Sequence, residues 1–179
     1  MTILIGEDEI RERVKELSEE IISDFGNQEF FIVALLKGSF VFLADLIREF
    51  HRRGSKLLVE FIGVSSYGGA TSPQGNPLVR EFARPSVCGE KVLLVDDILD
   101  TGSTLSKCKA ILEGEHPSTL KTCVFLVKNV KRVVDIVPDY YGFEIENKFV
   151  IGYGLDYDGR FRELPYITEI DEITTQNKT

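Results

Sequence analysis

The sequence has few of the residues that build metal and redox centres. It contains two histidines and three cysteines, Cys88, Cys108 and Cys123. The cysteines lie far apart, and none has the paired C-x-x-C spacing that indicates a zinc site or a thiol redox centre. Neither histidine has neighbours that indicate catalysis. We therefore expect the cysteines to be reduced packing residues.

Positive charge and long apolar runs are also scarce. The chain has 21 lysines and arginines against 29 acidic residues, a net charge of -8. A broad basic face, which binding to nucleic acid requires, is therefore not expected. The longest apolar run, Phe30 to Leu36, is far shorter than the ~20 residues that span a bilayer, and the start MTILIGEDEIRE becomes acidic before a signal peptide can develop. We expect a cytoplasmic protein that binds neither nucleic acid nor membranes.

The hydrophobic pattern predicts one α/β domain over residues 1–179. Apolar residues recur with a helical period over Glu7 to Asp24 and Phe40 to Phe50, and a further helix is expected near Ser103 to Leu112. Short apolar runs are typical of buried strands: Phe30 to Leu36, Leu57 to Val64, Val92 to Val95 and Cys123 to Val127. This alternation predicts a mainly parallel, twisted sheet flanked by helices.

Three more short strands are expected in the last part of the chain: Tyr141 to Ile145, Phe149 to Tyr153 and Tyr166 to Ile170. We expect them to form a small hood. Right-handed crossovers would place the turns Lys37 to Ser39 and Asp96 to Thr104 at the same edge of the main sheet.

The segment Val92 to Leu105, VLLVDDILDTGSTL, has the pattern of an anion site. Adjacent strand side chains point in opposite directions, so Asp96 and Asp97 cannot both face a core, and we expect them where the strand ends, at a solvent or ligand boundary. The residues from Asp100 to Thr104 offer a small-residue turn, hydroxyls and the first amides of a helix, which together can hold a phosphate. The two carboxylates could then bind sugar hydroxyls or a hard cation.

Two other interpretations of this segment are possible. Thr101 or Ser103 could simply cap a helix, with the acids favouring its positive end, and the residue pattern leaves cap and ligand site equally open. The phosphoacceptor receiver domains of signalling also have a strand that ends in an acidic pair. There the pair lies near the start of the domain, which does not fit the position of Asp96 and Asp97 in this chain.

Over its whole length, VLLVDDILDTGSTL resembles the phosphoribosyl pyrophosphate motif of the type I phosphoribosyltransferases. Asp100 stands where the 6-oxopurine (hypoxanthine) enzymes have an aspartate and the adenine and orotate enzymes generally have a non-acidic residue. The resemblance extends from LLKGSF near Leu35 to RFRELPYI ending at Ile167. It implies the type I fold and a Mg²⁺-dependent purine salvage enzyme. Such an enzyme transfers the 5-phosphoribosyl group from phosphoribosyl pyrophosphate to N9 of hypoxanthine, and to guanine or xanthine as further bases.

The resemblance also implies roles for individual residues. Asp100 would be the catalytic base near purine N7. The phosphoribosyl group would be bound by Asp96, Asp97, Asp100, Thr101, Gly102, Ser103 and Thr104, and the diphosphate by Lys37, Gly38 and Arg162. The purine would contact Lys128, Phe149, Val150 and Asp156, and Mg²⁺ would contact Asp96, Asp97 and Asp156. Ser66 and Tyr67 would belong to a mobile lid loop. Taken singly, most of these residues are compatible with ordinary turn, core or surface positions.

Several further expectations come with the family. The peptide between Leu36 and Lys37 is often cis, Lys128 would donate to the exocyclic oxygen of a 6-oxopurine, and the assembly would be a homodimer or homotetramer. One departure is Asp96, which stands where 6-oxopurine members often have glutamate. A nucleotide-sensing regulator on the same fold is the alternative function, and it would need a basic partner surface or an added DNA-binding domain.

Overall fold

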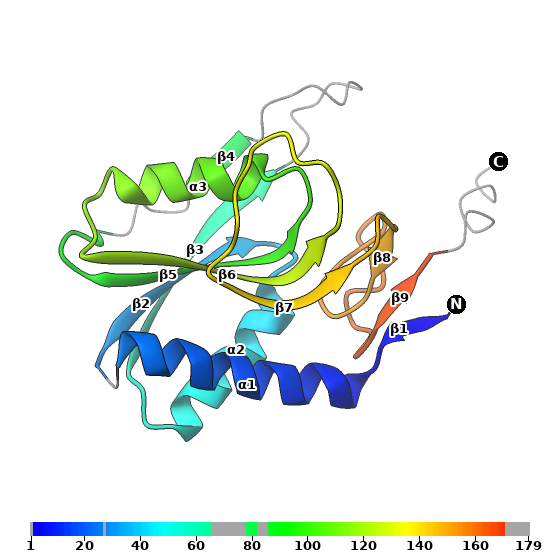
Figure 1. The fold of residues 1–179 in the computed structure, drawn as a ribbon, viewed down its shortest axis with the longest axis horizontal. Coiled ribbons are helices and arrows are strands. Elements are labelled where there is room, and N and C mark those ends of the chain that lie inside the picture. The colour runs from blue at the N-terminus through cyan, green and yellow to red at the C-terminus, as the bar shows by residue number, and fades with distance from the viewer. Residues whose placement is uncertain (1, 27, 66–77, 82–85, 171–179) are drawn as a thin grey trace.

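The computed structural model describes residues 2–26, 28–65, 78–81 and 86–170, and its elements follow the hydrophobic pattern of the chain (Figure 1). In chain order they are β1 Ile3–Ile5, α1 Glu7–Phe25, β2 Phe30–Leu36, α2 Phe40–Arg52, β3 Leu57–Ser65, β4 Leu78–Glu81, β5 Lys91–Leu99, α3 Ser103–Glu113, β6 Thr119–Lys128, β7 Tyr140–Ile145, β8 Val150–Ile151 and β9 Ile167–Glu169.

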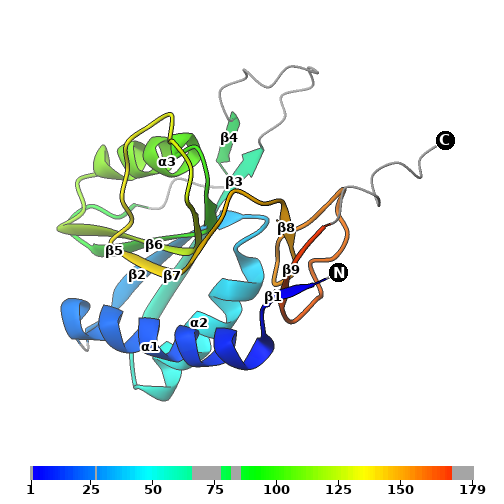
Figure 2. The ribbon, with the colours of Figure 1, turned by 45° about the vertical axis from the view of Figure 1, so that its right-hand side comes forward.

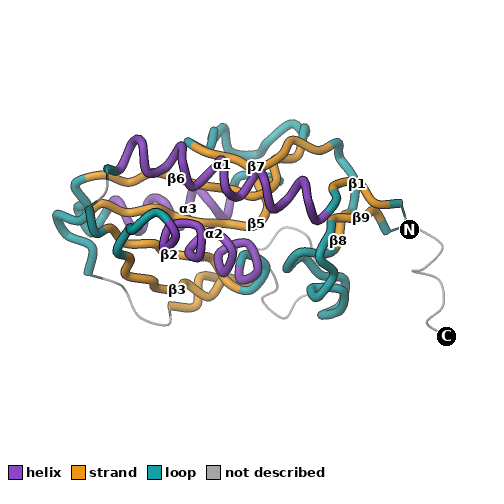
Figure 3. The backbone as a smooth tube through the Cα atoms, turned by 90° about the horizontal axis from the view of Figure 1, so that it is seen from below, coloured by secondary structure: helices purple, strands orange, loops and turns teal. Residues whose placement is uncertain are grey.

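The main sheet has the strand order β4-β3-β2-β5-β6-β7. Strands β3, β2, β5, β6 and β7 are parallel, and β4 pairs antiparallel with β3 at the edge. Helices α1 and α2 cover one face and α3 covers the other (Figures 1 and 3). The expected α/β class with a mainly parallel sheet is therefore confirmed.

Both faces of the central strands are buried. In β5, Leu93 and Val95 belong to the hydrophobic cluster that includes α1 and α2, whereas Val92 and Leu94 belong to the cluster that includes α3. All four are fully buried. A strand covered by helices on both sides needs a continuous apolar run, which is the pattern that the sequence shows here.

A second, three-stranded antiparallel sheet has the order β1-β9-β8 and stands at one end of the molecule (Figure 2). We call residues 150–170 the hood. The expectation that Tyr141 to Ile145 belongs to it is wrong, because β7 pairs with β6 as the outer strand of the main sheet. The side chain of Asp139, just before β7, accepts hydrogen bonds from the Thr122 amide at 2.8 Å and hydroxyl at 2.9 Å, which fixes this pairing. The third strand of the small sheet is β1 instead.

The segment that carries the acidic pair also differs from expectation. The predicted strand Val92 to Val95 continues to Leu99, because β6 keeps pairing with it as far as Leu99 and Val127. Asp96 and Asp97 therefore lie within the strand rather than after it. No helix in the described part of the chain is long and apolar enough to cross a membrane.

The central strands make a direct test of packing possible. We expect Leu94→Ala, at a fully buried position, to lower the free energy of unfolding by about 2–5 kcal/mol, because it removes apolar contacts and leaves a cavity. Leu58→Ala is the matched control, since Leu58 also lies in a parallel strand but is 43% exposed, and we expect it to change stability far less. Urea unfolding measures both, and equal losses would contradict the assignment of the core.

Candidate active site

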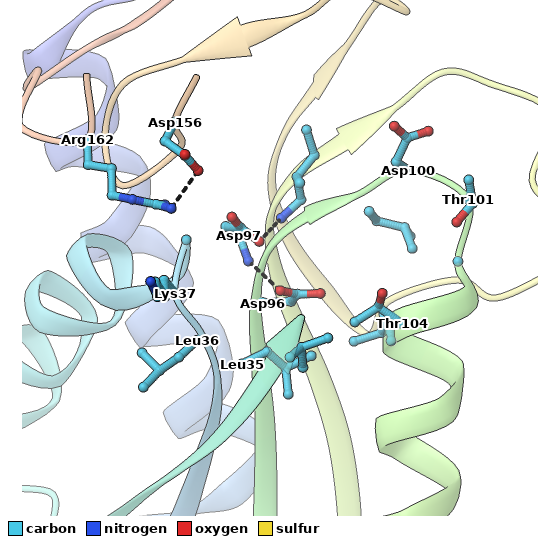
Figure 4. A pocket seen from close by; sticks show the side chains of 16 residues that line it. Leu35, Leu36, Lys37, Asp96, Asp97, Asp100, Thr101, Thr104, Asp156 and Arg162 are labelled. Carbon is cyan, nitrogen blue, oxygen red and sulfur yellow. Dashed lines mark hydrogen bonds and ion pairs between the residues drawn. The ribbon is translucent and has the colours of Figure 1, made fainter. Parts of the chain in front are cut away.

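A cavity of about 570 Å³ opens at the carboxyl ends of β2 and β5. Its wall combines the turn after β2, the end of β5 with the turn that follows, and the hood (Figure 4). The site residues predicted from the sequence that line it are Lys37, Gly38, Asp96, Asp97, Asp100, Thr101, Gly102, Thr104, Asp156 and Arg162. The two turns expected at one sheet edge therefore do meet there.

The acidic pair lies at the floor of this cavity. Asp96 is only 6% exposed. The Asp97 amide donates to Asp96 Oδ1 at 3.0 Å, and the Ile98 amide donates to Asp97 Oδ1 at 3.0 Å. Within the described residues, neither carboxylate forms an ion pair with a lysine or arginine. Burial raises the pKa of both groups, and for Asp96 the neighbouring charge of Asp97 raises it further.

This pair fits a divalent cation. A buried carboxylate beside a second, partly buried one is unfavourable when neither forms an ion pair, and hard cations such as Mg²⁺ prefer carboxylate oxygens. Unlike this pair, Asp156 has a cationic partner, because Arg162 lies 2.5 Å from its Oδ1. The Gly159 amide donates to its Oδ2 at 2.7 Å. No group of three or more potential metal-binding side chains occurs among residues that the structure describes. The arrangement fits an ion that keeps much of its coordination from water and substrate, as Mg²⁺ does.

The backbone of the turn after β2 lines the cavity and lies very close to Asp97 and to the hood. The Leu36–Lys37 peptide is cis. A Cβ atom added to Gly38 would lie 1.5 Å from Asp97 Oδ2, and one added to Gly154 would lie 2.2 Å from the Gly38 carbonyl oxygen. A side chain at position 154 would overlap the backbone, and one at position 38 would displace the Asp97 carboxylate, so Gly38 is held between the acidic pair and the hood.

The turn after β5 holds the start of α3 without a side-chain cap. The N-cap is Gly102, at a φ of 82°, so the interpretation of Thr101 or Ser103 as the cap residue is wrong. The Ser103 amide lies 3.5 Å from Thr101 Oγ1, which is long for a hydrogen bond. The first amides of α3 thus remain available to an anion. Ser103 itself lies outside the cavity lining.

A segment that the sequence did not indicate supports this turn. The amides of Val133 and Val134, in the connection between β6 and β7, donate to the Thr101 carbonyl oxygen at 3.0 and 3.1 Å. A Cβ atom on Gly102 would lie 2.6 Å from the Val134 carbonyl oxygen. The only sequence signal for this contact is the glycine at position 102.

Lys128 lies beside Asp100, which lines the cavity, although Lys128 itself is not part of the cavity lining. Lys128 Nζ is 3.0 Å from Asp100 Oδ2, and the two side chains are 12% and 48% exposed. Lys128 is the last residue of β6, and Asp100 follows β5 directly. The residues expected to read the base and to take its proton are thus neighbours, although 28 positions separate them in the chain.

The other predicted purine contacts lie in and beside the hood. Val150 is 6% exposed and packs in the core, whereas the ring of Phe149 is 52% exposed and meets the Tyr157 ring edge-on at 5.8 Å. Neither residue is part of the cavity lining. Their role in base binding stays a prediction. Ser66 and Tyr67, expected in the lid loop, lie outside the described residues.

Arg162 is held firmly within the hood. Its guanidinium pairs with Asp156 and also donates to the Gly154 carbonyl oxygen at 2.5 Å. Its charge therefore faces the cavity opposite the turn at Lys37 (Figure 4). This is a suitable position for a cation that receives an anionic group.

Comparison with known proteins identifies the family of the chain. The profile of the phosphoribosyl transferase domain matches residues 6–158. A hypoxanthine-guanine phosphoribosyltransferase of Aquifex aeolicus is 43% identical over 173 residues, which cover 96% of each chain. The enzyme of that name from Dictyostelium discoideum is 40% identical over 95% of each chain. The solved structure of hypoxanthine phosphoribosyltransferase from Trypanosoma cruzi, in complex with its product IMP, superposes with a TM-score of 0.86. It is 40% identical and covers 96% of this chain and 94% of that one.

A mainly parallel sheet with an acidic pair and a glycine-containing turn at its carboxyl edge, together with these matches, defines a type I phosphoribosyltransferase. Within this class, the chain belongs to the hypoxanthine-guanine phosphoribosyltransferase family.

The support of residues Asp100 to Thr104, which we call the phosphate loop after its predicted ligand, can be tested with a pair of glycines. Gly102 and Gly54 have nearly the same left-handed φ, 82° and 81°, but an added Cβ meets nothing within 4 Å at Gly54. We expect Gly54→Ala to cost only the ~1–2 kcal/mol of a left-handed alanine. Gly102→Ala should in addition weaken binding of phosphoribosyl pyrophosphate by about tenfold or more, because the loop must move. Calorimetric titration measures this, and equal affinity in the two variants would contradict it.

The acidic pair predicts an unusual dependence of stability on pH. Because burial raises the pKa of Asp96 in the folded protein, the folded state binds more protons than the unfolded state, and the free energy of unfolding falls as the pH rises between the two pKa values. We expect Asp96→Asn to be more stable than the wild type at about pH 8 without Mg²⁺. The difference should shrink toward about pH 4, where the carboxyl group of the unfolded chain also becomes protonated. Urea unfolding at several pH values tests this, and a less stable variant at the higher pH would refute it.

Proposed function

We propose that this protein transfers the 5-phosphoribosyl group of phosphoribosyl pyrophosphate to N9 of hypoxanthine and guanine, giving IMP or GMP and diphosphate. The observation that carries the proposal is the pairing of Lys128 with Asp100 beside the phosphate loop. A donor-only cation suits the exocyclic oxygen of a 6-oxopurine, and an adjacent carboxylate suits the proton that the base must lose.

The phosphoribosyl half of the substrate would be held at the end of β5. The amides at the start of α3 and the hydroxyls of Thr101 and Thr104 receive the 5-phosphate. Asp96 and Asp97 accept hydrogen bonds from the ribose hydroxyls, which offsets part of the cost of withdrawing these carboxylates from water. Asp96 is one methylene shorter than glutamate, and its place in the strand brings its carboxylate to the cavity floor.

The diphosphate half would be held by groups that already face one another. The backbone at Lys37 and Gly38 donates from one side, and Arg162 neutralises charge from the other. When bound, Mg²⁺ supplies positive charge that stabilises the leaving diphosphate, and Asp96, Asp97 and Asp156 are the residues that would hold it directly or through water. As the protein's partners we expect only these small molecules and further copies of the chain, in a homodimer or homotetramer.

The reaction exchanges one bond at C1 of the ribose. The bond from C1 to the diphosphate oxygen breaks, the bond from C1 to purine N9 forms, and the base loses one proton. Asp100 near N7 accepts this proton, a role typically worth ~10² to 10⁴ in rate. Lys128 orients the base through its exocyclic oxygen, and Phe149 and Val150 would pack beside the ring.

One assay tests the proposal as a whole. Wild-type protein with Mg²⁺ and phosphoribosyl pyrophosphate is given hypoxanthine, guanine, xanthine, adenine, uracil or orotate. We expect turnover with the 6-oxopurines and none with adenine, whose amino group cannot accept from the Lys128 ammonium. Turnover with none of the six bases would favour the nucleotide-sensing regulator.

Lys128 offers a sharper prediction. Lys128→Ala should lower kcat/KM for hypoxanthine by about 10- to 100-fold, because a charged hydrogen bond to the base is lost, with little change in binding of phosphoribosyl pyrophosphate. Lys121→Ala is the matched control, since Lys121 lies in the same strand and also pairs with a carboxylate, Asp24, at 3.0 Å. Equal loss of affinity for both substrates in Lys128→Ala would indicate damage to the fold and contradict the assigned role.

A further inference from the structure

Tyr153 occupies a backbone position that favours glycine. Its φ is 48°, and it stands between Gly152 and Gly154, which have φ values of 100° and 99°. A side chain in this left-handed region strains the backbone. The ring is nevertheless 5% exposed and packs on Phe125 of β6, with 4.8 Å between the ring centroids. The contacts of this side chain must offset the strain.

The Tyr153 hydroxyl reaches a different element from its ring. It donates to Asp45 Oδ2, in the second turn of α2, at 2.8 Å. Burial and the neighbouring Asp45 raise the pKa of Tyr153, so the hydroxyl keeps its proton and remains a donor. This hydrogen bond joins the hood to the helix that begins directly after the turn at Lys37 and Gly38.

The packing between α2 and the hood is incomplete beside this bond. A second cavity, of about 650 Å³, lies there, and its lining includes Asp45, Tyr153 and Arg162. Arg162 lines the active-site cavity as well. The Tyr153–Asp45 hydrogen bond stands at the wall of this space, where it is a directional contact between the hood and α2.

Tyr153 is also connected to both sides of the diphosphate site through its neighbour Gly154. The Gly154 amide donates to the Arg162 carbonyl oxygen at 3.0 Å, and its own carbonyl oxygen accepts from the Arg162 guanidinium. Gly154 also lies against the Gly38 carbonyl oxygen, since a Cβ atom there would be 2.2 Å away. A shift of Tyr153 would therefore move Arg162 relative to the backbone of Gly38.

We infer that Tyr153 is a positioning residue: its hydrogen bond to Asp45 sets the spacing between Arg162 and the Lys37–Gly38 backbone, and so the affinity for the diphosphate group. The inference rests on the proposed function, because it takes these two groups as the diphosphate site. It concerns one half of the substrate only. The phosphate loop and the Lys128–Asp100 pair belong to other elements, β5, α3 and β6, and should be unaffected.

Tyr153→Phe tests the inference, because it keeps the ring on Phe125 and removes only the hydroxyl. We expect the Michaelis constant for phosphoribosyl pyrophosphate and the dissociation constant for diphosphate with Mg²⁺ to rise about three- to tenfold, the effect of one lost hydrogen bond. The affinity for IMP, which has no diphosphate, and the Michaelis constant for hypoxanthine at saturating cosubstrate should stay within about twofold. Calorimetric titration with diphosphate and with IMP gives a readout that does not depend on turnover.

Tyr140→Phe is the matched control. Tyr140 is also a buried tyrosine, 6% exposed, and its hydroxyl donates to Asp24 at 2.6 Å, but it joins β7 to α1 away from the cavity. This variant should lose stability and keep its affinity for diphosphate.

A second set of variants removes the acceptor of the hydrogen bond. Asp45→Ala should behave like Tyr153→Phe, whereas Asp45→Asn should retain the hydrogen bond. The double variant Tyr153→Phe with Asp45→Ala should lose no more affinity for diphosphate than either single variant.

Other charges around Asp45 need their own control, because Arg48 pairs with it at 3.0 Å. Arg48→Ala removes that pair and should leave diphosphate affinity unchanged. The inference is overturned if Tyr153→Phe matches Tyr140→Phe, losing stability alone, or if IMP and diphosphate affinities fall together. If Tyr153→Phe does not fold, the comparison of Asp45→Ala with Asp45→Asn decides. Wild-type protein that neither turns over nor binds phosphoribosyl pyrophosphate would instead refute the proposed function.

Discussion

The backbone of Gly38 lies where three separate parts of the chain come together without room for a side chain. An added Cβ atom would overlap Asp97 on one side, and the Gly154 backbone meets the Gly38 carbonyl oxygen on the other. This contact brings the acidic pair of β5, the turn after β2 and the hood into one cavity wall. The remaining geometry of the site depends on it, because Arg162 is bound to Gly154 and the carboxylates lie directly beneath the turn.

Charge in the site is arranged in two different ways. At the rim, each acid has a cationic partner, as in the pairs Lys128–Asp100 and Arg162–Asp156. At the floor, Asp96 and Asp97 accept from backbone amides and lie beside each other, and no lysine or arginine of the described residues forms an ion pair with either, although the charge of Arg162 acts to lower the pKa of Asp97. Such a pair is costly to bury in the free protein, and the cost is relieved when a ligand brings hydroxyl donors or a metal ion. Stability is thus lower at the position where we propose that the substrate binds.

Most of the fold was predictable from apolar periodicity, and the departures have identifiable causes. Helix α1 and strand β2 match their predicted ranges within one residue because their patterns are long and regular. Strand β7 was assigned to the wrong sheet, because its alternating pattern does not say which edge it pairs with, and the Asp139–Thr122 hydrogen bonds decide this. Strand β1 has only three residues and gains its partner, β9, from the far end of the chain.

By itself, the sequence was sufficient for the resemblance that named the class of the protein, because VLLVDDILDTGSTL combines a buried strand, three aspartates and a small-residue turn within 14 consecutive residues. Residues that are consecutive in the chain are sufficient to show this resemblance. The residue types alone left a helix cap and a ligand site equally open. Only the tertiary structure decided which distant residues complete the site: Lys128 beside Asp100, Gly154 against Gly38, Val133 and Val134 beneath Thr101, and Tyr153 bound to Asp45. Each of these contacts joins residues from different elements, and their distances depend on how strands and hood pack, which no local pattern encodes.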